Sequence, residues 1–215
     1  RGVKVKILCK LLLFCSAIFL INFVNLTEAK GMDDTDKVIE RYYINDKFNV
    51  KYPEFIIDDQ KIGLEKVNNK VRSVADKFIK DLTKEDNLVS AQLGYDIHYF
   101  ANDICSFTIN TYVYNGGAHG VSELKGYNYN IKTGEALSFI KMFDFRPSQI
   151  NKNIFAKAKG DNLLLFDHFK GIEEYPENFY LLDAKTPIII FQQYEIAPYS
   201  SGIIKVPIVE ETEHI

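Results

Sequence analysis

Between residues 64 and 82, apolar side chains recur every three or four positions, and this period predicts an amphipathic helix. The polar run Asn68–Lys70 is expected to face solvent, away from the apolar stripe. The Asp58–Asp59 pair precedes the helix and offers a carboxylate cap for its free backbone N–H groups. The apolar stripe is expected to pack against a sheet formed by the strands that follow.

The cleanest alternation of apolar and polar residues lies in Val89–Tyr99, where odd-numbered side chains are expected to face the core and even-numbered ones the solvent. Ala101–Asp103 turns the chain back, and Cys105–Tyr114 continues the same alternation as an antiparallel partner strand. Cys105 is therefore expected on the apolar face, where a small buried thiol is inert.

The rest of the chain predicts more strands and a second helix. Val38–Tyr52 predicts one or two strands that end at Pro53. A helix is expected over Ser148–Lys159, because Pro147 is favoured at a helix start and Gly160 just past its end. The remaining expected strands are Glu123–Ile131, Phe179–Asp183, Ile188–Gln192 and Ile203–Ile208. Strands and helices do not alternate strictly, so the predicted class is α+β, with a mainly antiparallel sheet and two packed helices.

Residues 1–29 have the layout of a secretory signal peptide, in which a basic leader is followed by an apolar run and small residues. The apolar run Leu11–Phe23 is shorter than the ~20 residues of a membrane helix, so cleavage is expected rather than an anchor. Residues 30–37 form a polar linker. The protein is expected outside the cell or in its envelope, touching the membrane only if the leader stays uncleaved.

Charge narrows the range of partners. The chain has 26 Lys and Arg against 29 Asp and Glu residues, and without residues 1–29 the net charge becomes about −6. An acidic domain is repelled by phosphates, so no nucleic-acid partner is expected, whereas a cationic protein would be attracted. Cys105 is the one cysteine after the leader, so we expect an exported domain that depends on its core rather than on an internal disulfide.

Two loops rich in glycine and aromatic residues have the most distinctive local sequence. Tyr114–Gly120 follows the second of the alternating strands, and Tyr194–Gly202 lies between the last two strands. A tight turn is expected at Lys132–Glu135. The residues expected to shape these loops and this turn are Gly116, Gly117, Gly120, Gly134, Pro198 and Gly202.

These two loops, together with Asn130–Gly134 and Phe179–Leu181, resemble the paired extracellular domains of unknown function in bacterial RsiV-type anti-sigma factors. The same domains are similar to the segment before the deacetylase module of PdaC-type peptidoglycan enzymes. The likeness divides the chain into an N-terminal half, 38–120, and a C-terminal half, 121–212, expected to fold as one unit.

The resemblance implies a partner, because RsiV-like proteins use this region as a receptor for lysozyme, a strongly cationic muramidase. The sequence carries neither a cytoplasmic sigma-binding region nor a deacetylase module. A bare extracellular domain, exported by itself, is therefore expected.

Signatures of catalysis are weak. His119 and Glu123 form no metal signature, since zinc needs three or four converging ligands. The sequence contains no Gly-x-Ser-x-Gly elbow, and nothing fixes two carboxylates in the opposition that a glycosidase needs. We therefore expect no enzyme activity, no metal and no cofactor, and a hydrolase using His119 is the least favoured hypothesis.

Outward-facing tyrosines are the better functional candidates, because each offers contact area and a hydroxyl group. The candidate ligand-binding residues are Tyr114, His119, Tyr127, Tyr129, Glu195 and Tyr199. The leading hypothesis is a secreted, non-catalytic domain that binds a cationic protein such as lysozyme at the cell envelope. The alternative is a peptidoglycan-binding accessory domain whose tyrosines stack on sugar rings. A structural role also stays open, in which the tyrosines cover a second helical layer and His119 supports its loop.

Overall fold

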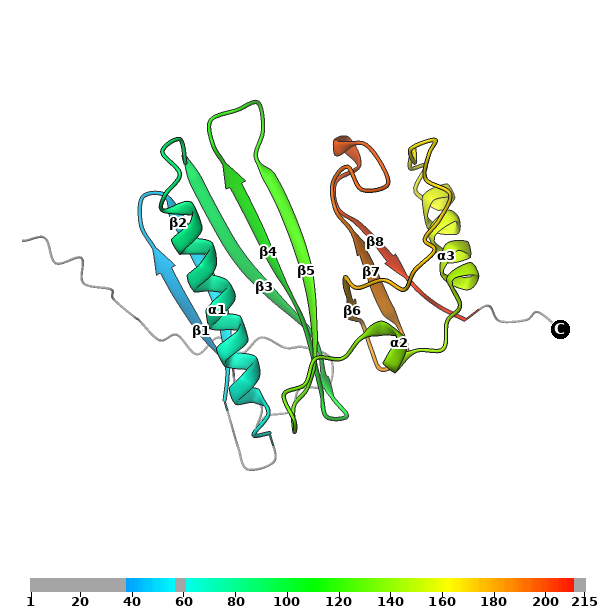
Figure 1. Cartoon of the computed structure of the whole chain (residues 1–215), viewed down its shortest axis with the longest axis horizontal. Coiled ribbons are helices and arrows are strands. Elements are labelled where there is room, and N and C mark those ends of the chain that lie inside the picture. The colour runs from blue at the N-terminus through cyan, green and yellow to red at the C-terminus, as the bar shows by residue number, and fades with distance from the viewer. Residues whose placement is uncertain (1–37, 57–60, 211–215) are drawn as a thin grey trace, which may run out of the picture.

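The computed structural model describes residues 38–56 and 61–210, which form two β-sheets flanked by helices (Figure 1). The first sheet, in the order β1-β2-β3-β4-β5, contains β1 (Val38–Ile44), β2 (Phe48–Phe55), β3 (Ser90–Ala101), β4 (Ile104–Tyr114) and β5 (Val121–Asn130). The second, in the order β6-β7-β8, contains β6 (Phe179–Leu181), β7 (Pro187–Phe191) and β8 (Ile204–Pro207). The helices are α1 (Leu64–Leu82), α2 (Phe139–Met142) and α3 (Pro147–Gly160). The α+β class is confirmed, and all strand pairs except β2–β3 are antiparallel.

Several expectations concern the limits of the domain. The leader (1–29), the linker (30–37) and the Asp58–Asp59 cap lie outside the described residues. The expected boundary between two halves, at residue 120, falls in the β4–β5 loop, and β5 completes the first sheet. Among the described residues, no helix has both the length and the apolar character needed to cross a bilayer.

Helix α1 covers one face of the first sheet, as its sequence period predicts (Figure 1). Its buried side chains include Leu64, Val67, Val71 and Ala75. They share a core with the odd-numbered residues of β4, including Cys105, which is fully buried.

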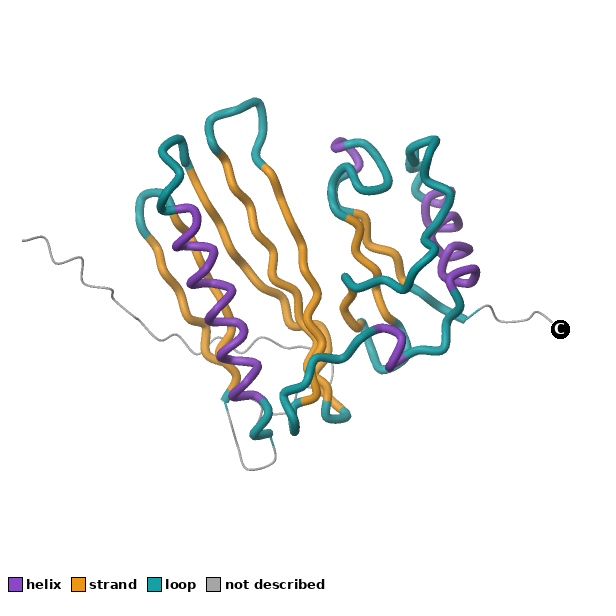
Figure 2. Tube along the Cα trace, viewed as in Figure 1, coloured by secondary structure: helices purple, strands orange, loops and turns teal. Residues whose placement is uncertain are grey.

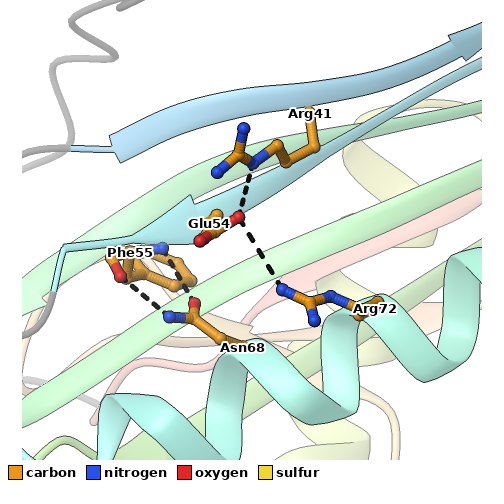
Figure 3. Close-up of polar contacts among 5 residues, drawn as sticks. All are labelled: Arg41, Glu54, Phe55, Asn68 and Arg72. Carbon is orange, nitrogen blue, oxygen red and sulfur yellow. Dashed lines mark hydrogen bonds and ion pairs between the residues drawn. The ribbon is translucent and has the colours of Figure 1, made fainter. Parts of the chain in front are cut away.

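Asn68 of α1 is buried instead of facing solvent as predicted (Figure 3). Its amide donates to the carbonyl oxygen of Phe55 and accepts from the Phe55 N–H, both at 2.8 Å. It can do so because β2 pairs with β3 only over Phe48–Val50, so the later backbone groups of β2 that point away from β1 have no strand partner. The predicted strand end at Pro53 is wrong for the same reason: its nitrogen points to this unpaired side, where no hydrogen is needed.

An ion-pair network lies next to this contact (Figure 3). The carboxylate of Glu54 accepts from Arg41 Nε at 2.5 Å and lies 3.9 Å from a guanidinium nitrogen of Arg72. The hydrogen bond from Arg41 holds the pKa of Glu54 below its ordinary value. The network therefore ties β1, β2 and α1 together.

The alternation predicted for β3 breaks at one residue. Ile97 pairs with Phe107 but Tyr99 pairs with Ser106, so His98 is an extra residue that forms a β-bulge. Beyond the bulge, Tyr99 joins the core of the second sheet instead of the α1 core that its odd position predicts.

His98 is a contact between the two sheets. Its ring stacks on Tyr180 of β6 with centroids 3.9 Å apart, and its Nε2 lies 2.9 Å from the hydroxyl of Thr108. Burial lowers the pKa of His98, with an opposing effect from Asp96 and a further lowering by Lys205.

The first part of the even-numbered face of β4, expected towards solvent, is covered by the second sheet, whereas Asn110 further along the strand is exposed as expected. Ser106 and Thr108 are almost fully buried. The Ser106 hydroxyl accepts from the N–H of Leu181 at 2.8 Å and donates to Asn128 at 2.7 Å. Asn128 in turn donates to the carbonyl oxygen of Phe179 at 2.8 Å. These buried polar groups are satisfied only while β6 stays docked.

The outer edge of β5 is capped by side-chain amides rather than by another strand. Gln192 accepts from the N–H of Leu124 at 3.1 Å and donates to its carbonyl oxygen at 2.7 Å. Asn178 donates to the same carbonyl oxygen at 2.9 Å and accepts from the N–H of Gly126 at 2.9 Å. These contacts fix the second sheet beside β5.

Helix α3 packs on the second sheet, on the side away from β5 (Figure 1). The helix predicted over Ser148–Lys159 is confirmed and extends by one residue at each end, to Pro147 and Gly160. Its inward residues Ile150, Ile154 and Ala158 are buried as expected.

Candidate functional site

The two glycine- and aromatic-rich loops meet at one end of the molecule, although they belong to different sheets (Figure 1). The hydroxyl of Tyr199 donates to the carbonyl oxygen of Gly120 at 3.0 Å. The rings of Tyr199 and His119 stack with centroids 4.0 Å apart and an interplanar angle of 25°. The Tyr194 ring also packs against Tyr199, with centroids 5.6 Å apart. We call Tyr114, His119, Tyr194, Glu195 and Tyr199 the two-loop surface.

The first loop is shaped by its own backbone contacts. Gly116 has a φ of 83°, which favours glycine, and the hydroxyl of Tyr114 donates to the Gly117 carbonyl oxygen at 2.9 Å. His119 Nδ1 lies 3.0 Å from the carbonyl oxygen of Gly120, and since a carbonyl can only accept, this nitrogen donates. A Cβ added at Gly120 would come within 2.3 Å of the Tyr112 ring, so a larger residue there would displace that ring.

The second loop is held by its buried residues and by hydrogen bonds to its backbone. Ile196 and Ala197 are buried, and the Ile196 carbonyl oxygen accepts from the N–H of Phe166 at 2.9 Å. The Glu195 carboxylate accepts from the N–H of Gln192 at 2.6 Å, so this exposed candidate also shapes its own loop. The later part of the loop runs from Pro198 through a 3₁₀ turn, and Gly202 ends it with a φ of 67°.

Tyr194 has the least ordinary geometry of the two-loop surface. Its φ is 66°, in the left-handed region that bulky residues rarely adopt, and 59% of its surface is exposed. A strained backbone that presents an aromatic ring to solvent is typical of a functional position. The sequence places Tyr194 in the loop but gives no sign of its backbone conformation.

Tyr127 and Tyr129 do not join the two-loop surface, and the expectation that they face outward is wrong. Both rings stack on Phe107 of the α1 core, with centroids 5.2 and 6.3 Å from it. Burial raises the pKa of the Tyr127 hydroxyl to about 12. They lie on the helix-covered face because β5 continues the alternation of β4.

The two-loop surface presents groups able to contact a ligand. It offers stacked rings, the hydroxyl of Tyr194 and the carboxylate of Glu195, on loops held by hydrogen bonds between side chains and the backbone. Within residues 38–56 and 61–210, no group of three His, Cys, Asp or Glu side chains is placed to share a metal ion.

Comparison with known proteins supports a domain-level similarity. Residues 40–122, which run from β1 to the start of β5 and include the first loop, match the family model described as "Deacetylase PdaC". No curated protein matches the sequence.

Two solved structures share the fold. A DUF3298 family protein from Pseudomonas aeruginosa PAO1 is 14% identical with a TM-score of 0.57, over 89% of this chain and 90% of that one. A member of the DUF3298 family from Bacteroides fragilis NCTC 9343 is 14% identical with a TM-score of 0.50, over 87% of each chain. At this identity the likeness shows the fold, which is that of DUF3298 proteins.

Proposed function

We propose that this protein is a secreted, non-catalytic domain of the bacterial cell envelope that binds a cationic protein, such as a lysozyme, through the two-loop surface. The observation that carries the proposal is the direct contact between the two loops, in which Tyr199 stacks on His119 and donates a hydrogen bond to Gly120. Loops that are already ordered lose little conformational entropy on binding, which favours affinity.

The exposed groups around the loops fit a protein partner. Val89 and Val121, which border the first loop, are 50% and 64% exposed. Aliphatic side chains exposed beside aromatic ones are typical of protein-binding surfaces. The acidic net charge of the exported chain would attract a cationic protein, and this attraction weakens with salt.

Titration calorimetry of the purified protein against a lysozyme at two salt concentrations tests the proposal. We expect binding that weakens at high salt, and at least tenfold weaker binding for Tyr194→Ala, since central aromatic residues often contribute about 2 kcal/mol. Tyr42→Ala, at the opposite edge of the first sheet, is the matched control and should bind as the wild type does. Equal affinities for the two variants would refute the role of the two-loop surface.

Peptidoglycan is the second candidate ligand, and the stacked rings of Tyr194, Tyr199 and His119 favour it, because such rings also bind sugar faces. In that case, sedimentation with purified wall glycan should retain the protein, with little effect of salt. The comparison of salt dependence separates the two ligands.

A further inference from the structure

The acidic segment Ile172–Asn178 crosses the second sheet and is held at both ends (Figure 2). At its start, Asn151 of α3 accepts from the Ile172 N–H at 2.7 Å and donates to the Ile172 carbonyl oxygen at 2.9 Å. At its end, Asn178 is bonded to β5, as described above, and its carbonyl oxygen accepts from Ile190 N at 3.0 Å. We call this segment the acidic ridge.

A cleft lies on each side of the acidic ridge. The first, about 420 Å³, separates it from β5 and the start of α2, and its lining is mainly apolar, including Leu137, Phe139, Ile140 and Tyr175. Ile140 and Tyr175 are 58% and 37% exposed. The second cleft, about 500 Å³, lies between the ridge and β7. Both volumes lie within the range of about 300–1,000 Å³ that is typical of ligand pockets.

The charges that border the clefts have one sign. Four carboxylates line the second cleft, those of Glu173, Glu174, Glu177 and Glu195, and Glu177 also lines the first. Among the described residues that line either cleft there is no lysine or arginine. None of the three ridge glutamates forms an ion pair with another described residue.

Apolar walls next to unpaired carboxylates determine what fits. An apolar ligand side chain would be buried in the first cleft, and a cation would be attracted by the second, where the low-dielectric walls strengthen the field. Arginine suits this position best, since its planar guanidinium both pairs with carboxylates and stacks on an aromatic face such as that of Tyr175.

We propose that the two clefts bind a short extended segment of a partner protein in which arginine alternates with apolar residues. An apolar side chain occupies the cleft beside β5, and an arginine occupies the cleft between the acidic ridge and Glu195. This site shares Glu195 with the two-loop surface, but its clefts are otherwise lined by different residues, and the proposal does not rest on lysozyme binding.

Fluorescence anisotropy with the purified protein and labelled synthetic peptides tests the proposal. The probe is acetyl-Arg-Leu-Arg-Leu-Arg-amide, and the comparison peptides replace Leu by Gly or Arg by Glu. We expect the probe to bind at least tenfold more tightly than either comparison peptide. A probe that does not bind at millimolar concentration, or that binds no better than its glycine version, would overturn the proposal.

Variants locate the binding. The triple variant E173Q/E174Q/E177Q should bind the probe at least tenfold more weakly, and Ile140→Ser should weaken it as well, whereas E65Q/E85Q/D86N, with the same change of charge on and after α1, should stay within twofold of the wild type. Equal weakening by the two triple variants would show general charge attraction and refute the site. A dimer of the protein alone that E173Q/E174Q/E177Q abolishes would show that a second copy fills the clefts, and would also refute it.

Discussion

Replacing Gly126 by alanine should undock the second sheet. Gly126 lies within the edge strand β5, next to β6 of the second sheet. A Cβ placed there would be 1.9 Å from the Phe179 carbonyl oxygen and 2.4 Å from its carbonyl carbon. Both contacts are with backbone, so no side-chain rotation relieves them. An ordinary van der Waals contact requires β6 to retreat by about 1.5 Å.

The cost follows from what this retreat breaks. Overpacking of this kind costs about 1–3 kcal/mol. The retreat also disrupts two buried hydrogen bonds, from Asn128 to Phe179 and from Leu181 to Ser106, and each buried polar group left unpaired costs about 1–3 kcal/mol. We expect a loss of about 3–9 kcal/mol in the free energy of unfolding, which is a large part of the about 5–15 kcal/mol that stabilises a typical domain.

Urea unfolding followed by circular dichroism measures this loss. Gly160→Ala is the matched control, because a Cβ at Gly160, in the last turn of α3, meets nothing within 4 Å. It should leave the unfolding free energy unchanged or raise it by up to about 1 kcal/mol. An unfolding free energy for Gly126→Ala within about 1 kcal/mol of the wild type would refute the close approach of β6 to β5.

Three further predictions concern stability. The pKa of His98 in the folded state lies below its ordinary value, so below a pH of about 6.5 the unfolded state binds more protons than the folded state. The free energy of unfolding should therefore fall as the pH drops through the folded pKa. Urea titrations from pH 8 to 5 measure this dependence, and His98→Gln should reduce it. Asn68→Leu leaves both Phe55 backbone groups unpaired and should lower the unfolding free energy by about 2–4 kcal/mol in urea, whereas the neighbouring exposed Asn69→Leu should change it by less than about 0.5 kcal/mol. Tyr199→Phe removes one hydrogen bond and should cost about 0.5–1.5 kcal/mol in the same assay; an unchanged value would show that this hydroxyl does not hold the loops.

Local pattern was enough to predict the elements but not how they pack. The period of α1 and the inner face of β4 follow from side-chain spacing, and the limits of α3 follow to within one residue from Pro147 and Gly160. Both kinds of signal are local. Asn68 was expected outside because its polarity is visible in the sequence while its partner, the unpaired backbone of Phe55, is not. Ser106 and Thr108 were expected outside because the second sheet that covers them is built from residues more than 50 positions away.

The candidate site divides in the same way. Composition identified both loops, because glycine, proline and tyrosine clusters are local signals, and it selected His119 and Tyr199, which the fold brings into contact. It also selected Tyr127, which packs in the core, because tyrosine composition does not tell which face of a strand is covered. The strained φ of Tyr194 and the amide caps on β5 depend on tertiary contacts and have no signature in the sequence.

The two-loop surface is formed by loops from both sheets. The free energy that keeps it assembled is therefore that of the interface between the sheets rather than that of either sheet. The first loop ends β4 and the second ends β7, and apart from their mutual contacts they are held in register by the amide caps along β5 and by the polar network beneath β6. Local opening of the second sheet would therefore separate His119 from Tyr199 while the five-stranded sheet and α1 stay folded. It follows that Gly126→Ala should lower the affinity of any ligand for the two-loop surface, although Gly126 lies about 20 Å along β5 from Gly120 and does not contact that surface. A ligand that requires both loops should in turn protect the amide hydrogens of β6 from exchange, since it stabilises the docked state alone.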